Sequence, residues 1–264
     1  MSPPEIRFNK IFLLLLRRFC RFAPHMNCHS SPPLPPEYDC IKVVKSFEEL
    51  ATARFEYPVN ALCWPRALAG DFQEVVEKLG TGEGIITLDE SLLTSLPVSP
   101  EGKIAINTLL EDLRLLKELE LDPVLNCIHG YPRDEDAGPV PTDVFSFHVD
   151  SAPVEAYTWL CTYYGPPSEG LRNEEATRRV DIPETRNELL QCFGGKDDAD
   201  FLSYLNENCY DLHYSPLAGA RPYSFGLGCL WRIAIEHPEN PVPPCIHRAP
   251  LTLPGDSPRL LLIS

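Results

Sequence analysis

From Asp122 to its end, the chain is a series of short β-forming segments separated by Pro and Gly, and this pattern limits the folds open to it. Two helical segments interrupt the series near residues 183–212. Many short strands with turns between them predict an antiparallel barrel or a jelly roll. The β-forming segments are DPVLNCIHG, DVFSFHVD, AYTWLCTYYG, SFGLGCLWRIAIEHP, PCIHRAPLTL and RLLLIS.

Residues 38–122 have a mainly helical pattern instead. In DFQEVVEKLG, Asp71 is the expected N-cap, Glu74 completes a capping box and Gly80 ends the helix. A longer amphipathic helix is expected between Pro100 and Asp122, because its apolar residues recur at near-helical spacing. These apolar residues are Ile104, Leu109, Leu113, Leu116 and Leu119.

Together the two patterns predict an α+β fold with a single domain over residues 38–264. Its C-terminal part, residues 123–264, is expected to form a double-stranded β-helix, the jelly roll of cupin-like proteins. Its N-terminal part, residues 38–122, is expected to pack helices on that jelly roll.

Residues 1–37 are expected to be a leader and a Pro-rich linker, both disordered. The leader's apolar run, Ile11 to Leu16, has six residues. That is too short to span a bilayer or to form a signal-peptide core, so no stable membrane span is expected. Its Arg-rich and acid-poor composition is similar to a mitochondrial presequence, but a plain tail, or a true start at Met26, fits as well. The stretch HSSPPLPPEYD predicts an extended linker.

The net charge and the cysteines limit which binding partners and which cellular compartment are expected. The formal net charge is −15, and without the basic first 25 residues the remainder carries −19. Such a surface repels phosphate groups, which argues against nucleic acid and anionic membranes as partners. The ten cysteines form no CxxC pair and sit singly among apolar neighbours. We therefore expect mostly reduced thiols packed as small hydrophobes and a cytoplasmic location, with the mitochondrion as the alternative.

One β-forming segment carries a pair of residues that suits a metal. Alternate residues of a strand point to the same face, so His148 and Asp150 in FSFHVD project together. A third ligand is available in His247, 99 residues later on the penultimate expected strand. Two imidazoles and one carboxylate form the facial triad that holds Fe(II) and leaves three positions open. The alternative is a solvated or structural His-Asp pair, because the HxD pattern alone is weakly specific.

Arg259 is the candidate co-substrate anchor. It follows His247 by twelve residues, and the intervening LPGDSP is expected to turn the chain so that the last two strands form a hairpin. An Arg on the last strand can bind the far carboxylate of 2-oxoglutarate bidentately. Arg248 is the weaker candidate, because it neighbours His247 and should face the opposite way. The alternative for Arg259 is an ordinary exposed side chain.

Thr162 and Tyr164 are expected to assist in binding the co-substrate. They share one face of the strand in LCTYYGPP, whereas Cys161 and Tyr163 share the other. If the face of Thr162 and Tyr164 lines the interior, its hydroxyl groups can donate hydrogen bonds to a ligand carboxylate. Ordinary core packing is the alternative.

The elements FHVD, LCTYYGPPSEGL, IHRAP and RLLLIS resemble those of the domain-of-unknown-function family numbered 1826, over roughly Tyr38 to Ser264. The chain departs from that family at YYGPPSEGL, where the family tends to have Arg and Gly-Thr, and in a longer stretch between Arg172 and Arg221. The HxD, His and Arg arrangement is in turn similar to that of Fe(II)/2-oxoglutarate-dependent oxygenases. This similarity implies a dioxygenase, an oxidoreductase that hydroxylates a small molecule.

Three functions remain open from the sequence. The first is the Fe(II)/2-oxoglutarate-dependent oxygenase. The second is a non-catalytic metal-binding protein of zinc homeostasis on the same fold, because the same ligands suit Zn²⁺. The third is a metal-free accessory protein in which the HxD pair is structural.

Overall fold

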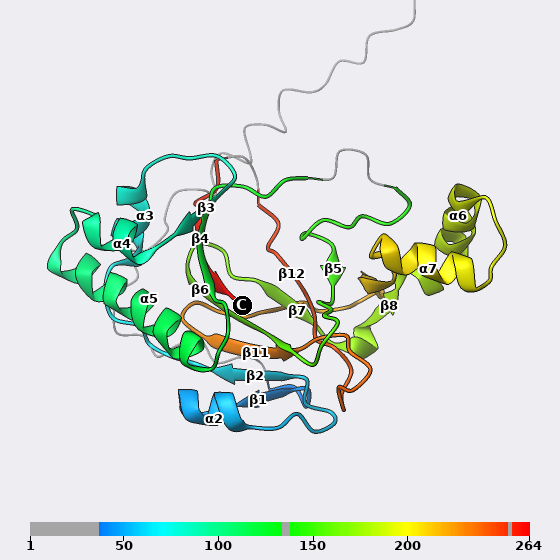
Figure 1. The fold of residues 1–264 in the computed structure, drawn as a ribbon, viewed down its shortest axis with the longest axis horizontal. Helices are drawn as coiled ribbons and strands as arrows, with labels where there is room; N and C mark the ends of the chain where they lie inside the picture. Colours follow the sequence, from blue (N-terminus) through cyan, green and yellow to red (C-terminus); the bar gives the residue numbers. More distant parts are fainter. Residues whose placement is uncertain (1–36, 134–137, 253–254) are drawn as a thin grey trace, which may run out of the picture. The chain divides into compact units, whose positions relative to one another are not determined.

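The fold was analysed in a computed structural model that describes residues 37–133, 138–252 and 255–264, so the expectations for residues 1–36 lie outside it. The described strands form two sheets, whose strands are labelled in Figure 1. The larger sheet has the strand order β1-β2-β11-β6-β13-β4-β3, and only its β1–β2 pair is parallel. Its strands are Ile41–Val43 (β1), Ala61–Trp64 (β2), Ile85–Leu88 (β3), Val124–Ile128 (β4), Tyr157–Tyr164 (β6), Leu230–Ala234 (β11) and Arg259–Ile263 (β13).

The smaller sheet is antiparallel throughout, with the order β10-β7-β12-β5-β9-β8. Side chains from both sheets meet in one buried cluster, which includes Leu160 and Trp231 of the larger sheet and Tyr223 of the smaller. The two sheets therefore face each other across an apolar layer. The strands of the smaller sheet are Phe147–His148 (β5), Glu169–Leu171 (β7), Ala176–Arg178 (β8), His213–Pro216 (β9), Tyr223–Ser224 (β10) and Ile246–Arg248 (β12).

This arrangement confirms the mixed α+β class and is compatible with a β-sandwich. The jelly roll stays a prediction. Residues 38–122 do hold helices that pack on the sheet, but they also supply β1, β2 and β3 to the larger sheet. The predicted hairpin of the last two strands is wrong. β12 pairs with β5 and β7 in the smaller sheet, whereas β13 pairs with β4 and β6 in the larger one, so the connection between them crosses from sheet to sheet.

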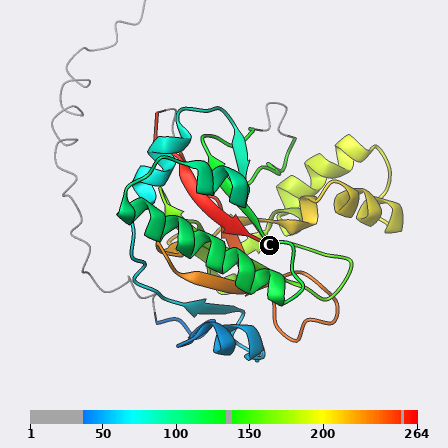
Figure 2. The ribbon, with the colours of Figure 1, turned by 60° about the vertical axis from the view of Figure 1, so that its left-hand side comes forward.

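Helices cover the outer face of the larger sheet. Figure 2 shows the longest of them, α5, running across that face, with α3 and α4 beside it. The α5 helix ends at Glu118, four residues before the predicted end at Asp122. The helices are Phe47–Thr52 (α2), Phe72–Leu79 (α3), Glu90–Ser95 (α4), Pro100–Glu118 (α5), Pro183–Phe193 (α6) and Ala199–Glu207 (α7).

The predicted boundaries of α3 are confirmed, but its capping box is not. Asp71 is the N-cap, its side chain accepts from the Glu74 backbone N–H, and Gly80 is the C-cap. The Glu74 carboxylate does not return to its own N-cap. It accepts instead from the backbone N–H and the hydroxyl of Ser99, which is the N-cap of α5. The pair thereby joins the starts of the two helices, a tertiary contact that no local pattern reveals.

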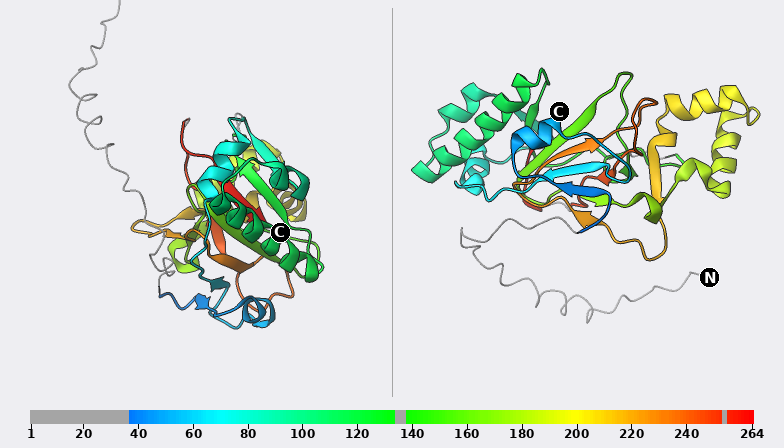
Figure 3. Two further views of the ribbon diagram at one scale, coloured as in Figure 1. Left: turned by 90° about the vertical axis from the view of Figure 1, so that its left-hand side faces the viewer. Right: turned by 90° about the horizontal axis from the view of Figure 1, so that it is seen from below.

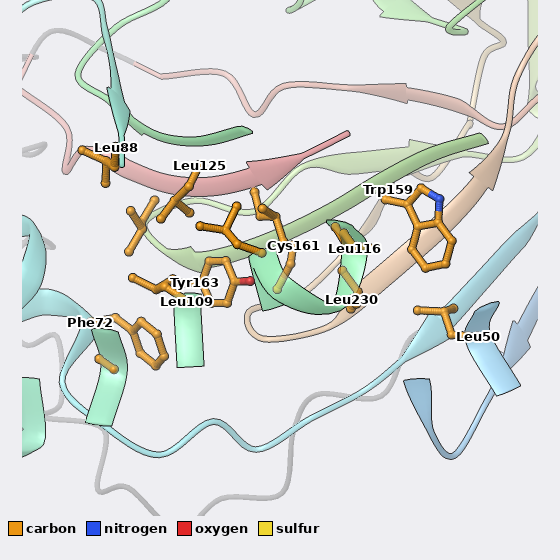
Figure 4. Packing of buried hydrophobic residues seen from close by; sticks show 14 of the residues in the cluster. Leu50, Phe72, Leu88, Leu109, Leu116, Leu125, Trp159, Cys161, Tyr163 and Leu230 are labelled. Carbon is orange, nitrogen blue, oxygen red and sulfur yellow. The ribbon is translucent and has the colours of Figure 1, made fainter. Parts of the chain in front are cut away.

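The main core lies between these helices and the larger sheet. Figure 4 shows Leu109 and Leu116 of α5 with Cys161 and Tyr163 of β6, and all four are buried. The alternating side chains of β6, such as Leu160, point into the layer between the sheets. Ile104, expected in the buried stripe of α5, is instead 46 % exposed. It lies roughly 140° around the helix from Leu109, on the side away from the core.

A buried ion pair fixes α5 to the sheet. Asp112 of α5 accepts two hydrogen bonds from Arg66, which follows β2, at 2.7 and 2.8 Å. The hydroxyl of Tyr163 donates to the same carboxylate at 2.6 Å. Burial raises the pKa of Tyr163 well above its ordinary value, so its hydroxyl stays protonated and available as a donor.

The helical insertion predicted near residues 183–212 is present as α6, α7 and a 3-10 turn at Tyr210–Leu212. Figure 3 shows α6 and α7 at the opposite end of the sheets from α3 to α5. The insertion has its own small core of Val140, Val180, Leu189, Phe201 and Leu205. The helical insertion leads directly into β9 and does not cover the larger sheet.

Cysteines and hydropathy add two observations. The eight described cysteines form no disulfide, and five of them are buried: Cys63, Cys127, Cys161, Cys229 and Cys245. Within the described ranges, none of the helices has the length and apolar character needed to cross a membrane.

Candidate metal centre

The smaller sheet brings the three predicted metal ligands together. His247 of β12 pairs directly with His148 of β5, so the two imidazoles point to the same face. Asp150, two residues after His148, joins them. Its two carboxylate oxygens lie 4.0 Å from His148 Nε2 and 3.5 Å from His247 Nε2. The ligand atoms of all three residues lie within 4.8 Å of one another, a spacing that suits one metal ion.

Backbone contacts aim both imidazoles at Asp150. His148 Nδ1 lies 2.7 Å from the Ser146 carbonyl oxygen, and His247 Nδ1 lies 3.2 Å from that of Cys245. A carbonyl only accepts, so each Nδ1 carries the proton and each Nε2 keeps its lone pair. Metal-binding histidines commonly donate their second N–H to a carbonyl in this way. The donor set therefore fits a metal ion at the two Nε2 atoms and the Asp150 carboxylate.

The charge states of the triad also suit a cation. Burial, together with the nearby His247, lowers the pKa of His148 to about 4, so this imidazole is neutral near pH 7. Burial alone would raise the pKa of Asp150. The attraction of His247 and a hydrogen bond from Thr158 outweigh burial and hold that pKa below its ordinary value. The site thus presents a carboxylate beside a neutral imidazole, as metal ligation requires.

Thr158 is a site residue that the sequence reading missed. It lies on β6 of the larger sheet, is 7 % exposed, and donates its hydroxyl proton to Asp150 Oδ2. The carboxylate is therefore held from across the layer between the sheets. The signal in the sequence was a hydroxyl at an inward position of AYTWL, eight residues after Asp150.

Arg259 lies at the start of β13 and is 1 % exposed, so the reading as an ordinary surface Arg is wrong. Its guanidinium donates to the Pro166 carbonyl at 2.7 Å, to the Tyr131 hydroxyl at 2.7 Å and to Ser168 Oγ at 2.9 Å. Among the described residues none of its partners is a carboxylate. Burial lowers the pKa of Arg259, because a charge without a counter-charge loses free energy of hydration when it is buried.

The position of Arg259 relative to the triad follows from the strand register. Its partner Ser168 lies two residues before Gly170, and Gly170 pairs with His247. At about 3.3 Å per strand residue, Ser168 lies about 7 Å along the strand from the level of the triad. Arg248 faces away, as predicted. It forms an ion pair with Glu169 at 2.7 Å and lies over the ring of Phe147.

The predicted helpers Thr162 and Tyr164 are not brought to the triad. Thr162 is buried on β6, and its side chain makes no hydrogen bond within the described residues. The pairing of β6 with β13 skips Tyr163, so the extra residue of this β-bulge lies in β6, and Tyr164 packs against the helix-covered core. The alternation that placed both hydroxyl groups on one face therefore does not hold through Tyr164. Cys161 and Tyr163 do share the other face, as expected.

A third histidine lies next to the triad. His213 is the first residue of β9 and pairs directly with His148. The two rings have centroids 5.6 Å apart. His213 is 5 % exposed, and its buried Nδ1 has no hydrogen-bond partner among the described residues. A hollow of about 250 Å³ is lined by His213 together with His148 and Asp150.

The fold and the site define an α+β protein with two facing sheets and a candidate His-Asp-His metal centre between them. No family model, no curated protein and no solved structure matches the chain. The resemblance to the domain-of-unknown-function family 1826 therefore stays a prediction.

Proposed function

We propose that the protein is an Fe(II)- and 2-oxoglutarate-dependent oxygenase, on a jelly-roll variant of the two-sheet fold, that oxidises a small molecule. The proposal is supported by two features that occur together in this fold. One is the triad of His148, Asp150 and His247. The other is the buried guanidinium of Arg259, which has no carboxylate partner among the described residues. A metal-chelating dicarboxylate satisfies both at once.

In this proposal each residue has a separate task. His148, Asp150 and His247 hold the metal on one side and leave its other positions open. Thr158 fixes the orientation of the Asp150 carboxylate. Arg259 binds the far carboxylate of 2-oxoglutarate, while Tyr131 and Ser168 hold its guanidinium in place. Fe(II), when bound, supplies the activation of O₂ coupled to decarboxylation of 2-oxoglutarate.

A non-catalytic zinc-binding protein is the second candidate, and one observation favours it. Neutral groups of the protein already accept a hydrogen bond from each of the three guanidinium nitrogens of Arg259. Arg259 can therefore be a structural residue, and the triad alone binds Zn²⁺ more tightly than Fe²⁺ by the usual affinity order.

Binding of 2-oxoglutarate separates the two candidates. Addition of 2-oxoglutarate to the anaerobic Fe(II) protein should produce a visible metal-to-ligand charge-transfer band. Arg259→Gln should weaken this binding about ten- to a hundredfold and leave iron binding nearly intact, because a charge-assisted contact of roughly 1.5–3 kcal/mol is lost.

Arg248→Gln is the matched control, since Arg248 is bound to Glu169 and faces away from the triad. It should bind 2-oxoglutarate as the wild type does. A wild-type protein that binds iron but has no affinity for 2-oxoglutarate would rule out the oxygenase and leave the zinc-binding candidate.

A further inference from the structure

Arg179 has no partner for its charge among the described residues. It follows β8, it is half-buried, and its Nε is buried without an acceptor. Its side chain makes neither a hydrogen bond nor an ion pair with any residue in 37–133, 138–252 or 255–264. Burial lowers its pKa, and no described carboxylate opposes that effect. Its neighbour Arg178, by contrast, forms an ion pair with Asp181. Because Arg179 is only half-buried and unpaired, its guanidinium is open to an anion from solution.

The strand register places Arg179 in one row with the metal centre. His247 pairs with His148, His148 pairs with His213, and β8 continues the row, because Arg178 pairs with Tyr214. Arg179, the next residue, begins a 3-10 turn that packs against β9, so it lies at the end of this row where β9 begins with His213. Neighbouring strands are about 4.8 Å apart, so Arg179 lies roughly 10 Å from the level of His148, with His213 between them.

His213 is the second group at this end of the row. Its ring is almost fully buried, and its Nδ1 has no partner within the described residues. A neutral imidazole carries one N–H and can donate it to an anion. Thus one hydrogen-bond donor and one cation meet beside the triad.

Two acids, Asp143 and Asp211, act on His213, and neither forms an ion pair with Arg179 among the described residues. Asp143 also lines the hollow next to His213, but its Oδ1 accepts from the backbone N–H groups of Phe145 and Ser146, at 3.0 and 3.2 Å. The Asp143 carboxylate therefore closes a local turn, and Arg179 keeps its charge available.

We propose that Arg179 and His213 bind the carboxylate of the small-molecule substrate, so that the protein acts on a carboxylic acid. This inference rests on the proposed function. The substrate's reacting carbon would then lie over the triad, in the hollow bounded by His148, Asp150 and His213. Arg259 lies on the β7 side of His247, and Arg179 lies on the β8 side of His148. The two anions, co-substrate and substrate, thus approach the metal from opposite sides.

Acetate, the simplest suitable carboxylate, tests the site when compared with acetamide, which has the same shape without the charge. The full chain, loaded with Zn²⁺, is titrated with each while the side-chain Nε–H signal of Arg179 is followed by NMR. Acetate should shift this signal saturably, and acetamide should not. His213→Gln should weaken acetate binding about tenfold, and Arg179→Gln should abolish it. Arg178→Gln, one residue away, should leave it unchanged.

The same titration in the presence of saturating 2-oxoglutarate shows whether Arg179 binds the substrate or the co-substrate. An unchanged acetate response supports the substrate site. Loss of the response means that Arg179 holds the co-substrate, which overturns the inference, as does an equal response to acetamide or no response at all. An acetate response in protein that binds no 2-oxoglutarate would leave this anion site in place and rule out the proposed oxygenase, so the two failures are distinguishable.

Discussion

Asp150 receives contacts from both sheets. His148 and His247 approach it from the smaller sheet, and Thr158 donates to it from the larger one. A carboxylate that is held on one oxygen by a hydroxyl group cannot rotate freely, so it presents a fixed lone pair to a metal ion. Outer contacts of this kind commonly affect metal affinity by about ten- to a hundredfold.

Thr158→Val should therefore weaken metal binding about ten- to a hundredfold without unfolding the protein. Val has nearly the same shape but cannot donate to Asp150. Competition with a chelator of known affinity measures the change. Thr162→Val, on the same strand but without a contact to the triad, is the control. An equal loss of affinity in both variants would mean that Thr158 has no special role.

His213 should make the stability of the metal-free protein depend on pH. Its pKa is about 4 in the folded chain and 6.5 ordinarily, so between these values the unfolded chain binds more protons. The free energy of unfolding should therefore fall as the pH is lowered from about 6.5 to 4. For His213 alone the loss is on the order of 2–3 kcal/mol.

Urea unfolding at about pH 7.5 and pH 4.5 measures this loss, and His213→Gln should lose less by that amount. Carboxylates that titrate in the same range contribute equally to both proteins and cancel in the comparison. Parallel pH dependences of the wild type and the variant would contradict the buried, neutral state of His213.

At the scale of elements, α5 depends on a polar contact as well as on its apolar stripe. Asp112 is 2 % exposed and is bound to Arg66 and Tyr163, so its removal leaves a buried guanidinium without a counter-charge. Asp112→Ala should destabilise the protein by roughly 3–5 kcal/mol. Tyr163→Phe, which removes only one donor, should cost about 1–3 kcal/mol. Chemical denaturation measures both, and equal costs would contradict the role given to the ion pair.

The elements also show what a sequence pattern can predict. The boundaries of α3 followed from Asp71 and Gly80, because capping is decided within one turn of helix. The hairpin of β12 and β13 failed because a turn signal such as LPGDSP does not say which sheet receives the next strand. His213 was missed for a similar reason. The start of β9 is fixed by its pairing with β5 and β8, not by its own residues.

For the whole molecule, the metal ligands were easier to predict than their surroundings. The period of a strand joins His148 to Asp150, and the expected strand order suggested His247. Thr158 and the partners of Arg259 come from the other sheet or from loops, and only the packing of the two sheets brings them in. The division of strands between two sheets cannot be read from their spacing along the chain.

The central claim is that residues 99 positions apart, on β5 and β12, form one metal site. Elemental analysis of protein loaded with Fe(II) or Zn²⁺ and then desalted tests it most directly. Wild type should hold one metal ion per chain, and His148→Ala, Asp150→Ala and His247→Ala should each hold close to none while circular dichroism shows an intact fold. His213→Gln, beside the site but outside the triad, should keep its metal. A wild type without metal, or full metal content in His247→Ala, would contradict the account.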